Sequence, residues 1–184
     1  KKCRALFVCI IFVLLLLFWN IVRSYTSLEL ETYFVASDKL YSEIKLVLIS
    51  DLHDHEFGER NLKLVNMIAQ EEPDLILMAG DFINDDSENE DIVLSLVKEL
   101  GKIAPTYFSM GNHELDYESR TGVDLVEKIT DAGATVLELA YEDIEINGES
   151  IRIGGMYEYA FAMDGDNSTK PENMDSDVYQ FLKE

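Results

Sequence analysis

Three strand-like segments recur at even intervals in this chain, and each is followed at once by polar side chains that can bind a cation. The segments span residues 45–50, 74–79 and 105–110. The side chains that follow them are those of Asp51, His53, Asp81, Asn112 and His113. Asp81 lies 30 residues after Asp51 and Asn112 lies 31 residues after Asp81, about one strand–helix unit of a parallel sheet. Because functional groups gather at the carboxyl ends of parallel strands, we expect these side chains to meet at one edge of a sheet.

Apolar residues at helical spacing separate the three segments. Residues 59–72 carry the first such pattern, which Pro73 ends, and residues 92–100 carry the second, which Gly101 ends. Strands and helices therefore alternate along the chain. This alternation predicts an α/β fold in which helices flank a parallel sheet.

Further segments extend this layout toward the C-terminus. We expect a third helix over residues 123–132, a strand over 135–139, and a hairpin over 143–153 that turns at Asn-Gly. Residues 84–91 contain five acidic residues in eight and are expected to form a solvated loop. Residues 164–177 are rich in Asp, Asn, Ser and Gly, which is typical of a flexible insertion or linker.

The polar clusters resemble the motif set of the calcineurin-like metallophosphoesterase family. That set is D-x-H, then G-D, then G-N-H followed by Asp or Glu, each after a strand. In this chain the set reads Asp51-Leu52-His53, Gly80-Asp81 and Gly111-Asn112-His113-Glu114. The resemblance covers roughly residues 44–155 and implies a layered β-sheet sandwich flanked by helices.

The resemblance also implies a site for two divalent metal ions. Asp51 and His53 would bind the first ion, Asp81 would bridge both ions, and Asn112 would bind the second through its amide oxygen. His113 would act as a general acid beside the leaving group, or would orient the phosphate. Mixed carboxylate, imidazole and amide ligands suit Mn, Fe or Zn better than Ca. The implied reaction is hydrolysis of a phosphate mono- or diester by a metal-activated water.

Residues beside these ligands are expected to support them. Glu114 would hold a histidine in place rather than bind a metal. Gly80 and Gly111 would allow the backbone to approach the metals closely. Asp54 and His55 lie in the loop that carries His53, and we expect no direct role for either.

Histidines that the family carries near its C-terminus, in G-H and G-H-x-H segments, have no counterpart here. The chain has three histidines in all, at positions 53, 55 and 113. We therefore interpret residues 45–184 as a metallophosphoesterase domain that is incomplete at its C-terminus. We expect residues 1–184 alone to bind one cation modestly and to turn over substrate poorly.

The N-terminus predicts a membrane anchor. Residues 5–22 contain a single polar residue, and as a helix they would be about 27 Å long, close to the hydrocarbon thickness of a bilayer. A cleaved signal peptide is the alternative, but no A-x-A-like site follows the apolar run. Basic residues crowd its N-terminal side, which favours one transmembrane helix at 1–23 with the domain outside the cytoplasm. Residues 24–44 would form a linker and edge strands, with a strand over 28–35 and a turn over 37–39.

Charge narrows the possible partners. The chain carries 36 acidic and 15 basic residues, and four of the basic ones lie in the first 23 residues. Such an acidic domain repels nucleic acid, which excludes a nucleic-acid partner. A phosphate ester remains acceptable because bound cations invert the local charge, and the anchor favours a lipid-linked or envelope phosphate. The alternatives to a phosphoesterase are a non-catalytic binding or scaffold module on the same fold, and an acidic cation-binding domain.

Overall fold

The computed structural model describes residues 2–156, 180–181 and 183, and the chain divides into two units, residues 1–35 and 36–184. The first unit contains helix α1 (Lys2–Thr26). The window Cys9–Thr26 of α1 has a mean hydropathy of 1.9, and none of it is buried within the described residues. Its length suits a membrane span, and a signal sequence has the same features. The helix is therefore consistent with either an anchor or a signal sequence.

The strand expected over residues 28–35 is wrong, because residues 27–45 contain no strand. The backbone of a strand needs a partner strand for its hydrogen bonds. The part of the chain that the structure describes offers no such partner to residues 28–35. The turn expected over 37–39 is present at Asp38 and Lys39.

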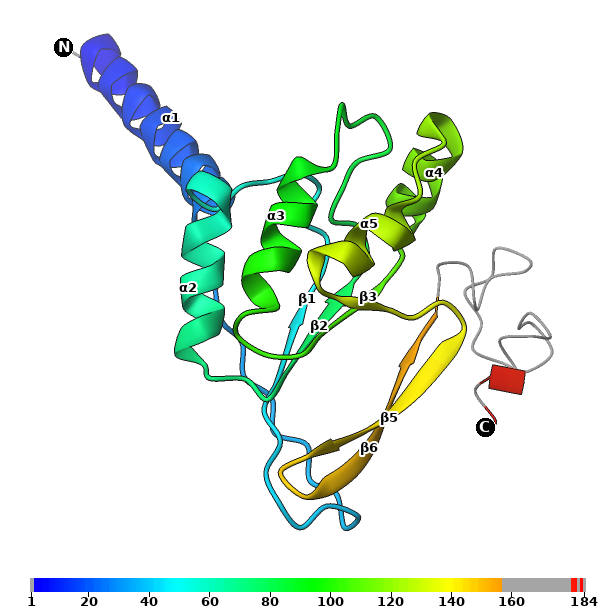
Figure 1. Ribbon diagram of the computed structural model, residues 1–184. Helices are drawn as coiled ribbons and strands as arrows, with labels where there is room; N and C mark the ends of the chain where they lie inside the picture. Colours follow the sequence, from blue (N-terminus) through cyan, green and yellow to red (C-terminus); the bar gives the residue numbers. More distant parts are fainter. Residues whose placement is uncertain (1, 157–179, 182, 184) are drawn as a thin grey trace. The chain divides into compact units, whose positions relative to one another are not determined.

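The second unit is built on a parallel sheet of four strands in the order in which they occur in the sequence (Figure 1). The strands are β1 (Leu46–Ile49), β2 (Leu75–Ala79), β3 (Thr106–Ser109) and β4 (Thr135–Val136). Leu46 pairs with Leu75 in the first ladder, and Leu77 pairs with Tyr107 in the second. This register aligns the ends of β1, β2 and β3 at one edge, so the loops that follow them start side by side.

Helices connect the strands. After the short 3-10 turn η1 (Glu59–Asn61) come the helices α2 (Leu62–Gln70), α3 (Asp91–Leu100), α4 (Asn112–Thr121) and α5 (Leu125–Ala132). The apolar spacing predicts α2, α3 and α5, whereas α4 carries no such spacing and is not among the expected helices. Ile76, Met78 and Phe108 on one face of the sheet are at most 1% exposed. Leu96 and Ile129 of the helices are buried too. The α/β fold with helices flanking a parallel sheet is therefore confirmed.

A hairpin covers the other face of the sheet. Strands β5 (Ala140–Ile146) and β6 (Glu149–Gly155) pair antiparallel across Asn147 and Gly148, whose positive φ values of 53° and 81° suit a tight primed turn. Isoleucines of the hairpin pack against Leu75 and Tyr107. Tyr107 donates a hydrogen bond to Glu142 at 2.8 Å, and its burial together with that carboxylate raises its pKa to about 12. The hairpin expected at Asn-Gly is thus present, as the second β layer.

Strand β1 differs from the buried strand that its apolar run suggests. Leu46 is 48% exposed and Leu48 is 66% exposed. The reason is that β1 is the edge strand of the sheet, whereas the hairpin packs on the part of this face that β2 and β3 form. The linker expected over 164–177 lies outside the described residues.

Candidate metal centre

The loops after β1 and β2 stay paired beyond the ends of their strands. Asp51 donates its backbone N–H to Gly80 at 3.1 Å, and His53 donates to the Asp81 carbonyl at 3.0 Å. These bonds hold the side chains of Asp51, His53 and Asp81 together, with one ligand atom of each within 4.8 Å of the others. The structure therefore brings together three of the five ligand-type residues that the sequence singles out.

Backbone strain accompanies this arrangement. The φ angles of Asp51, His53, Asp54 and Asp81 are 55°, 48°, 57° and 60°. Residues other than glycine rarely adopt positive φ, at a cost on the order of 1–3 kcal/mol each. Such strain persists where the surrounding structure enforces it, and here it is present at all three residues of the cluster, Asp51, His53 and Asp81.

Two glycines allow the loops after β2 and β3 to lie against each other. A Cβ atom on Gly80 would lie 2.7 Å from the Gly111 Cα atom. A Cβ atom on Gly111 would lie 2.7 Å from the Asp81 backbone nitrogen and closer still to its carboxylate. The absence of a side chain at Gly80 and Gly111 therefore lets the two loop backbones approach each other and leaves room for the Asp81 side chain.

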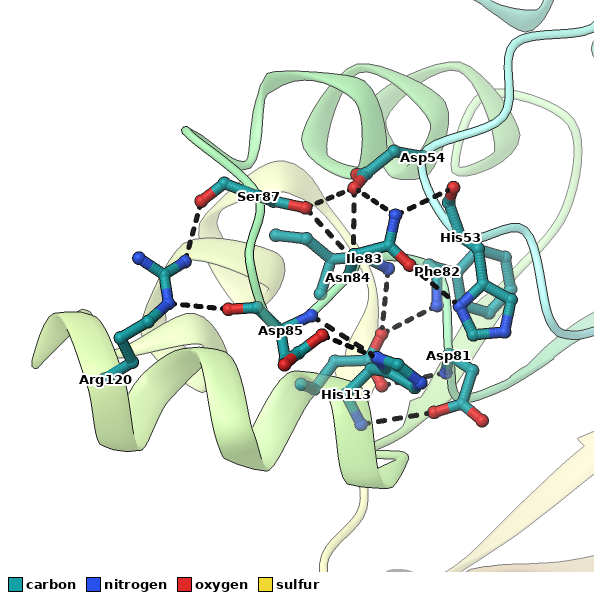
Figure 2. A network of polar contacts seen from close by, with 11 residues as sticks. His53, Asp54, Asp81, Phe82, Ile83, Asn84, Asp85, Ser87, His113 and Arg120 are labelled. Atoms are coloured by element: carbon teal, nitrogen blue, oxygen red, sulfur yellow. Dashed lines mark hydrogen bonds and ion pairs between the residues drawn. The ribbon is translucent and has the colours of Figure 1, made fainter.

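The first turn of α4 lies beside the cluster and carries the two remaining predicted residues. Asn112 is the first residue of α4 and follows Gly111, the residue against which Asp81 packs. His113 donates its backbone N–H to Asp81 Oδ1 at 3.3 Å. The His113 ring lies edge-on to the His53 ring, with the two centroids 4.6 Å apart. Helix α4 thus begins at the cluster and presents His113 to it (Figure 2).

The expectation that Glu114 holds a histidine in place is not met: among the described residues its hydrogen-bond partners are all backbone N–H groups. Its side chain is 0% exposed. It accepts hydrogen bonds from the backbone N–H groups of Asp81, Phe82 and Gly111 at 2.7–2.8 Å, and from Ile83 at 3.3 Å. A buried carboxylate is stabilised by such donors, so Glu114 joins the loop after β2 to the start of α4. It supports the Asp81 backbone and not an imidazole.

Asn84 fixes the orientation of the His53 ring, and sequence reasoning missed it. Asn84 Nδ2 donates to the His53 carbonyl at 3.2 Å and to Asp54 Oδ2 at 3.1 Å. Its Oδ1 atom therefore faces His53 Nδ1, at 3.1 Å (Figure 2). Because a carbonyl oxygen only accepts, the neutral His53 ring carries its proton on Nδ1 and keeps a lone pair on Nε2 for a cation. In the sequence, the one indication of a role for Asn84 is its position three residues after Asp81.

His113 has the complementary arrangement. The Asp85 backbone N–H donates to His113 Nδ1 at 3.3 Å, and Asp85 Oδ1 lies 3.6 Å from the same nitrogen. In the neutral ring Nδ1 is thus the acceptor, and the proton lies on Nε2. In the protonated ring the Asp85 carboxylate balances the charge. Residues 84–91 are therefore not simply a solvated loop, and Glu90 within them is only 8% exposed.

The donor set fits a divalent cation. Asp51 is exposed and Asp81 is partly buried, and neither forms an ion pair with a lysine or arginine in the part of the chain that the structure describes. Two carboxylates this close repel each other unless a cation lies between them. Carboxylate oxygens and an imidazole nitrogen are ligands that Mn, Fe and Zn accept.

A parallel α/β sheet that gathers Asp, His and Asp at its carboxyl edge is a suitable framework for a metal-dependent hydrolase. The chain belongs to the calcineurin-like phosphoesterase family, whose sequence model matches residues 44–184. This match confirms the family that the three motifs indicate.

Relatives of known name agree with this assignment. An uncharacterized metallophosphoesterase of Campylobacter jejuni is 24% identical over 134 residues, which cover 70% of this chain and 36% of the relative. An uncharacterized metallophosphoesterase of Aquifex aeolicus is 26% identical over 160 residues, 85% of this chain and 57% of the relative. Phosphodiesterase YaeI of Escherichia coli is 30% identical over 96 residues, 50% of this chain and 36% of the relative. The chain thus spans between 36% and 57% of the length of these relatives.

Proposed function

We propose that the full protein is a metal-dependent phosphoesterase that hydrolyses phosphate mono- or diesters. The observation that carries this proposal is the cluster of Asp51, His53 and Asp81, with ligand atoms within 4.8 Å at the carboxyl edge of the sheet. Family membership supplies the reaction class. The relative named as a phosphodiesterase supports a diester, and family membership alone does not choose between the two esters.

The proposed ligands divide between two divalent ions, Mn, Fe or Zn. Asp51 and His53 would hold the first ion, Asp81 would bridge, and Asn112 would hold the second. When bound, such a pair supplies an activated water and neutralises the charge on the phosphate oxygens. The residues of this chain position the donors: Asn84 holds the His53 ring through Nδ1, which leaves Nε2 for the ion, and the paired loops hold the two aspartates together.

His113 is proposed as the general acid. To act as an acid the ring would have to be an imidazolium, with Nδ1–H facing the Asp85 carboxylate 3.6 Å away and Nε2–H available to a leaving-group oxygen. The edge-on contact between the His113 and His53 rings supports this role. Transfer of the Nε2 proton would release the leaving group as the alcohol and leave the His113 ring as a neutral imidazole beside the Asp85 carboxylate.

The test is hydrolysis by the full-length protein of p-nitrophenyl phosphate and of bis(p-nitrophenyl) phosphate. We expect activity that chelation with EDTA abolishes and that added Mn²⁺ restores, because the donors alone supply no nucleophile. The ratio of the two rates assigns the mono- or diester preference. A protein that binds Mn²⁺ but hydrolyses neither ester with any divalent metal would contradict the proposal and favour the non-catalytic binding module.

Helix α1 is proposed to anchor the domain in the membrane, with the domain outside the cytoplasm. The support is a helix whose window Cys9–Thr26 is apolar and unburied within the described residues, with basic residues concentrated ahead of it. An anchored enzyme would meet lipid-linked phosphate esters. We expect the full protein to stay in the membrane fraction after washing at alkaline pH. Protease added outside an intact cytoplasmic membrane should digest the domain. Release as a shortened, soluble chain would indicate a cleaved signal sequence.

A further inference from the structure

Helix α4 holds the acidic loop (residues 84–91) through an arginine that lies outside the proposed metal centre. Arg120 Nε donates to the Asp85 carbonyl at 2.6 Å, and Arg120 Nη2 donates to the Ser87 carbonyl at 2.7 Å. Figure 2 shows the guanidinium at one end of the polar network and the two histidines at the other. Two nitrogens of one planar group therefore bind two carbonyls of one loop.

The position of Arg120 on α4 links it to His113. The two residues are seven apart, which places them on the same helix face. Tyr117 lies between them on that face, with its ring centroid 5.2 Å from Arg120 Cζ and its hydroxyl donating to Glu90 at 2.8 Å. One face of α4 therefore holds the acidic loop at three points: His113 at Asp85, Arg120 at the two carbonyls, and Tyr117 at Glu90.

The start of the acidic loop is tied to the loop after β1. Asn84 contacts His53 through its side chain. The Asn84 backbone N–H donates to Asp54 Oδ2 at 3.1 Å, and the Ser87 hydroxyl also bonds Asp54. The acidic loop is thus a bridge that contacts His53 on one side and His113 on the other.

We propose that Arg120 is a positioning residue for the two histidines. Its forked guanidinium fixes the backbone carbonyls of Asp85 and Ser87 against α4. This keeps the Asp85 N–H at His113 Nδ1 and the Asn84 amide at His53 Nδ1. The catalytic consequence of this clamp rests on the proposed function, whereas the clamp itself does not.

Arginine is suited to this task in a way that lysine is not. A guanidinium offers five N–H donors in a fixed plane, so it can serve two carbonyls at once, whereas an ammonium is a point charge on a flexible stem. Arg120 is exposed, so its replacement leaves the core of the second unit in place. Arg120→Lys keeps the charge and removes the fork, and it separates clamping from a purely electrostatic role.

The first arm of the test needs no activity. Amide hydrogen exchange of the metal-free full-length protein should be about tenfold faster at residues 85–87 in Arg120→Lys than in the wild type, because the loop opens more often. The imidazole C–H resonances of His53 and His113 should shift. Arg60→Lys, the same change at an exposed residue of η1, should alter neither. Unchanged exchange and unchanged resonances in Arg120→Lys would overturn the proposal.

The second arm uses the hydrolysis of p-nitrophenyl phosphate. We expect kcat to fall roughly tenfold in Arg120→Lys with KM within about twofold of the wild type. The general acid acts in the transition state, so its misplacement slows the reaction without weakening substrate binding. A raised KM with unchanged kcat and unchanged exchange would instead mean that Arg120 contacts the substrate, and the clamp would be rejected. An inactive wild type would contradict the proposed function and leave the exchange arm to decide on the clamp.

Discussion

Asp81→Asn should lower kcat/KM for an aryl phosphate by at least roughly 10³-fold, about 4 kcal/mol of transition-state stabilisation. Asp81 lies within 4.8 Å of both Asp51 and His53, and it is the proposed ligand common to two ions. An amide offers one neutral oxygen in place of two charged ones, so it can neither bridge nor neutralise. The loss should appear in kcat, because the bound ions stabilise charge that develops during the reaction.

The folded state should survive this change. Asp81 Oδ1 accepts the His113 N–H, and an asparagine Oδ1 can accept it as well. Replacing one of two adjacent carboxylates also removes a repulsion from the metal-free state. Urea denaturation without metal should therefore give a midpoint equal to that of the wild type or slightly higher, while calorimetry with Mn²⁺ should show weakened binding.

Asp116→Asn is the matched control for this experiment. It makes the same chemical change at an exposed position of α4, and its rates should stay within about twofold of the wild type. Hydrolysis by Asp81→Asn at an unchanged, metal-dependent rate would show that the reaction takes place elsewhere in the protein. The Asp51, His53 and Asp81 cluster would then be a cation site without a catalytic role.

The sequence predicts the centre of the site well, for a topological reason. Parallel strands of similar spacing must end at the same edge, so a ligand-type residue after each strand predicts a cluster without any knowledge of side-chain contacts. Asp51, His53 and Asp81 meet in this way. The hairpin at Asn147 and Gly148 is equally local, because its turn depends on two residues that tolerate positive φ.

The supporting contacts lie beyond what a single sequence indicates. Asn84 and Arg120 belong to an irregular loop and an exposed helix face, where no periodic pattern predicts which polar groups meet. Glu114 matches its motif position, but its partners are backbone N–H groups that only the folded loops bring within reach. The exposure of β1 depends on which strands the hairpin covers, and this is a property of the sheet as a whole.

Gly111→Ala should displace Asp81 and weaken metal binding. The backbone of Gly111 is extended, with φ −96° and ψ −179°, so alanine meets no conformational strain there and the effect is purely steric. The new Cβ would lie 2.7 Å from the Asp81 nitrogen and 2.9 Å from its Cγ. The Asp81 N–H is held by Glu114 at 2.8 Å, so the loop cannot move away freely. We expect a cost of about 1–3 kcal/mol in stability and a loss of roughly 10²-fold in kcat/KM from the misplaced ligand.

Gly101→Ala provides the comparison, because its Cβ would meet no atom nearer than 3.4 Å and its φ of −61° suits alanine. Calorimetry with Mn²⁺ and urea denaturation of both variants should separate the site effect from the general effect of an added methyl group. Gly101→Ala should match the wild type in both measurements. Wild-type affinity for Mn²⁺ in Gly111→Ala would show that metal binding does not depend on the present position of the Asp81 carboxylate. Asp81 would then not be a metal ligand in this geometry.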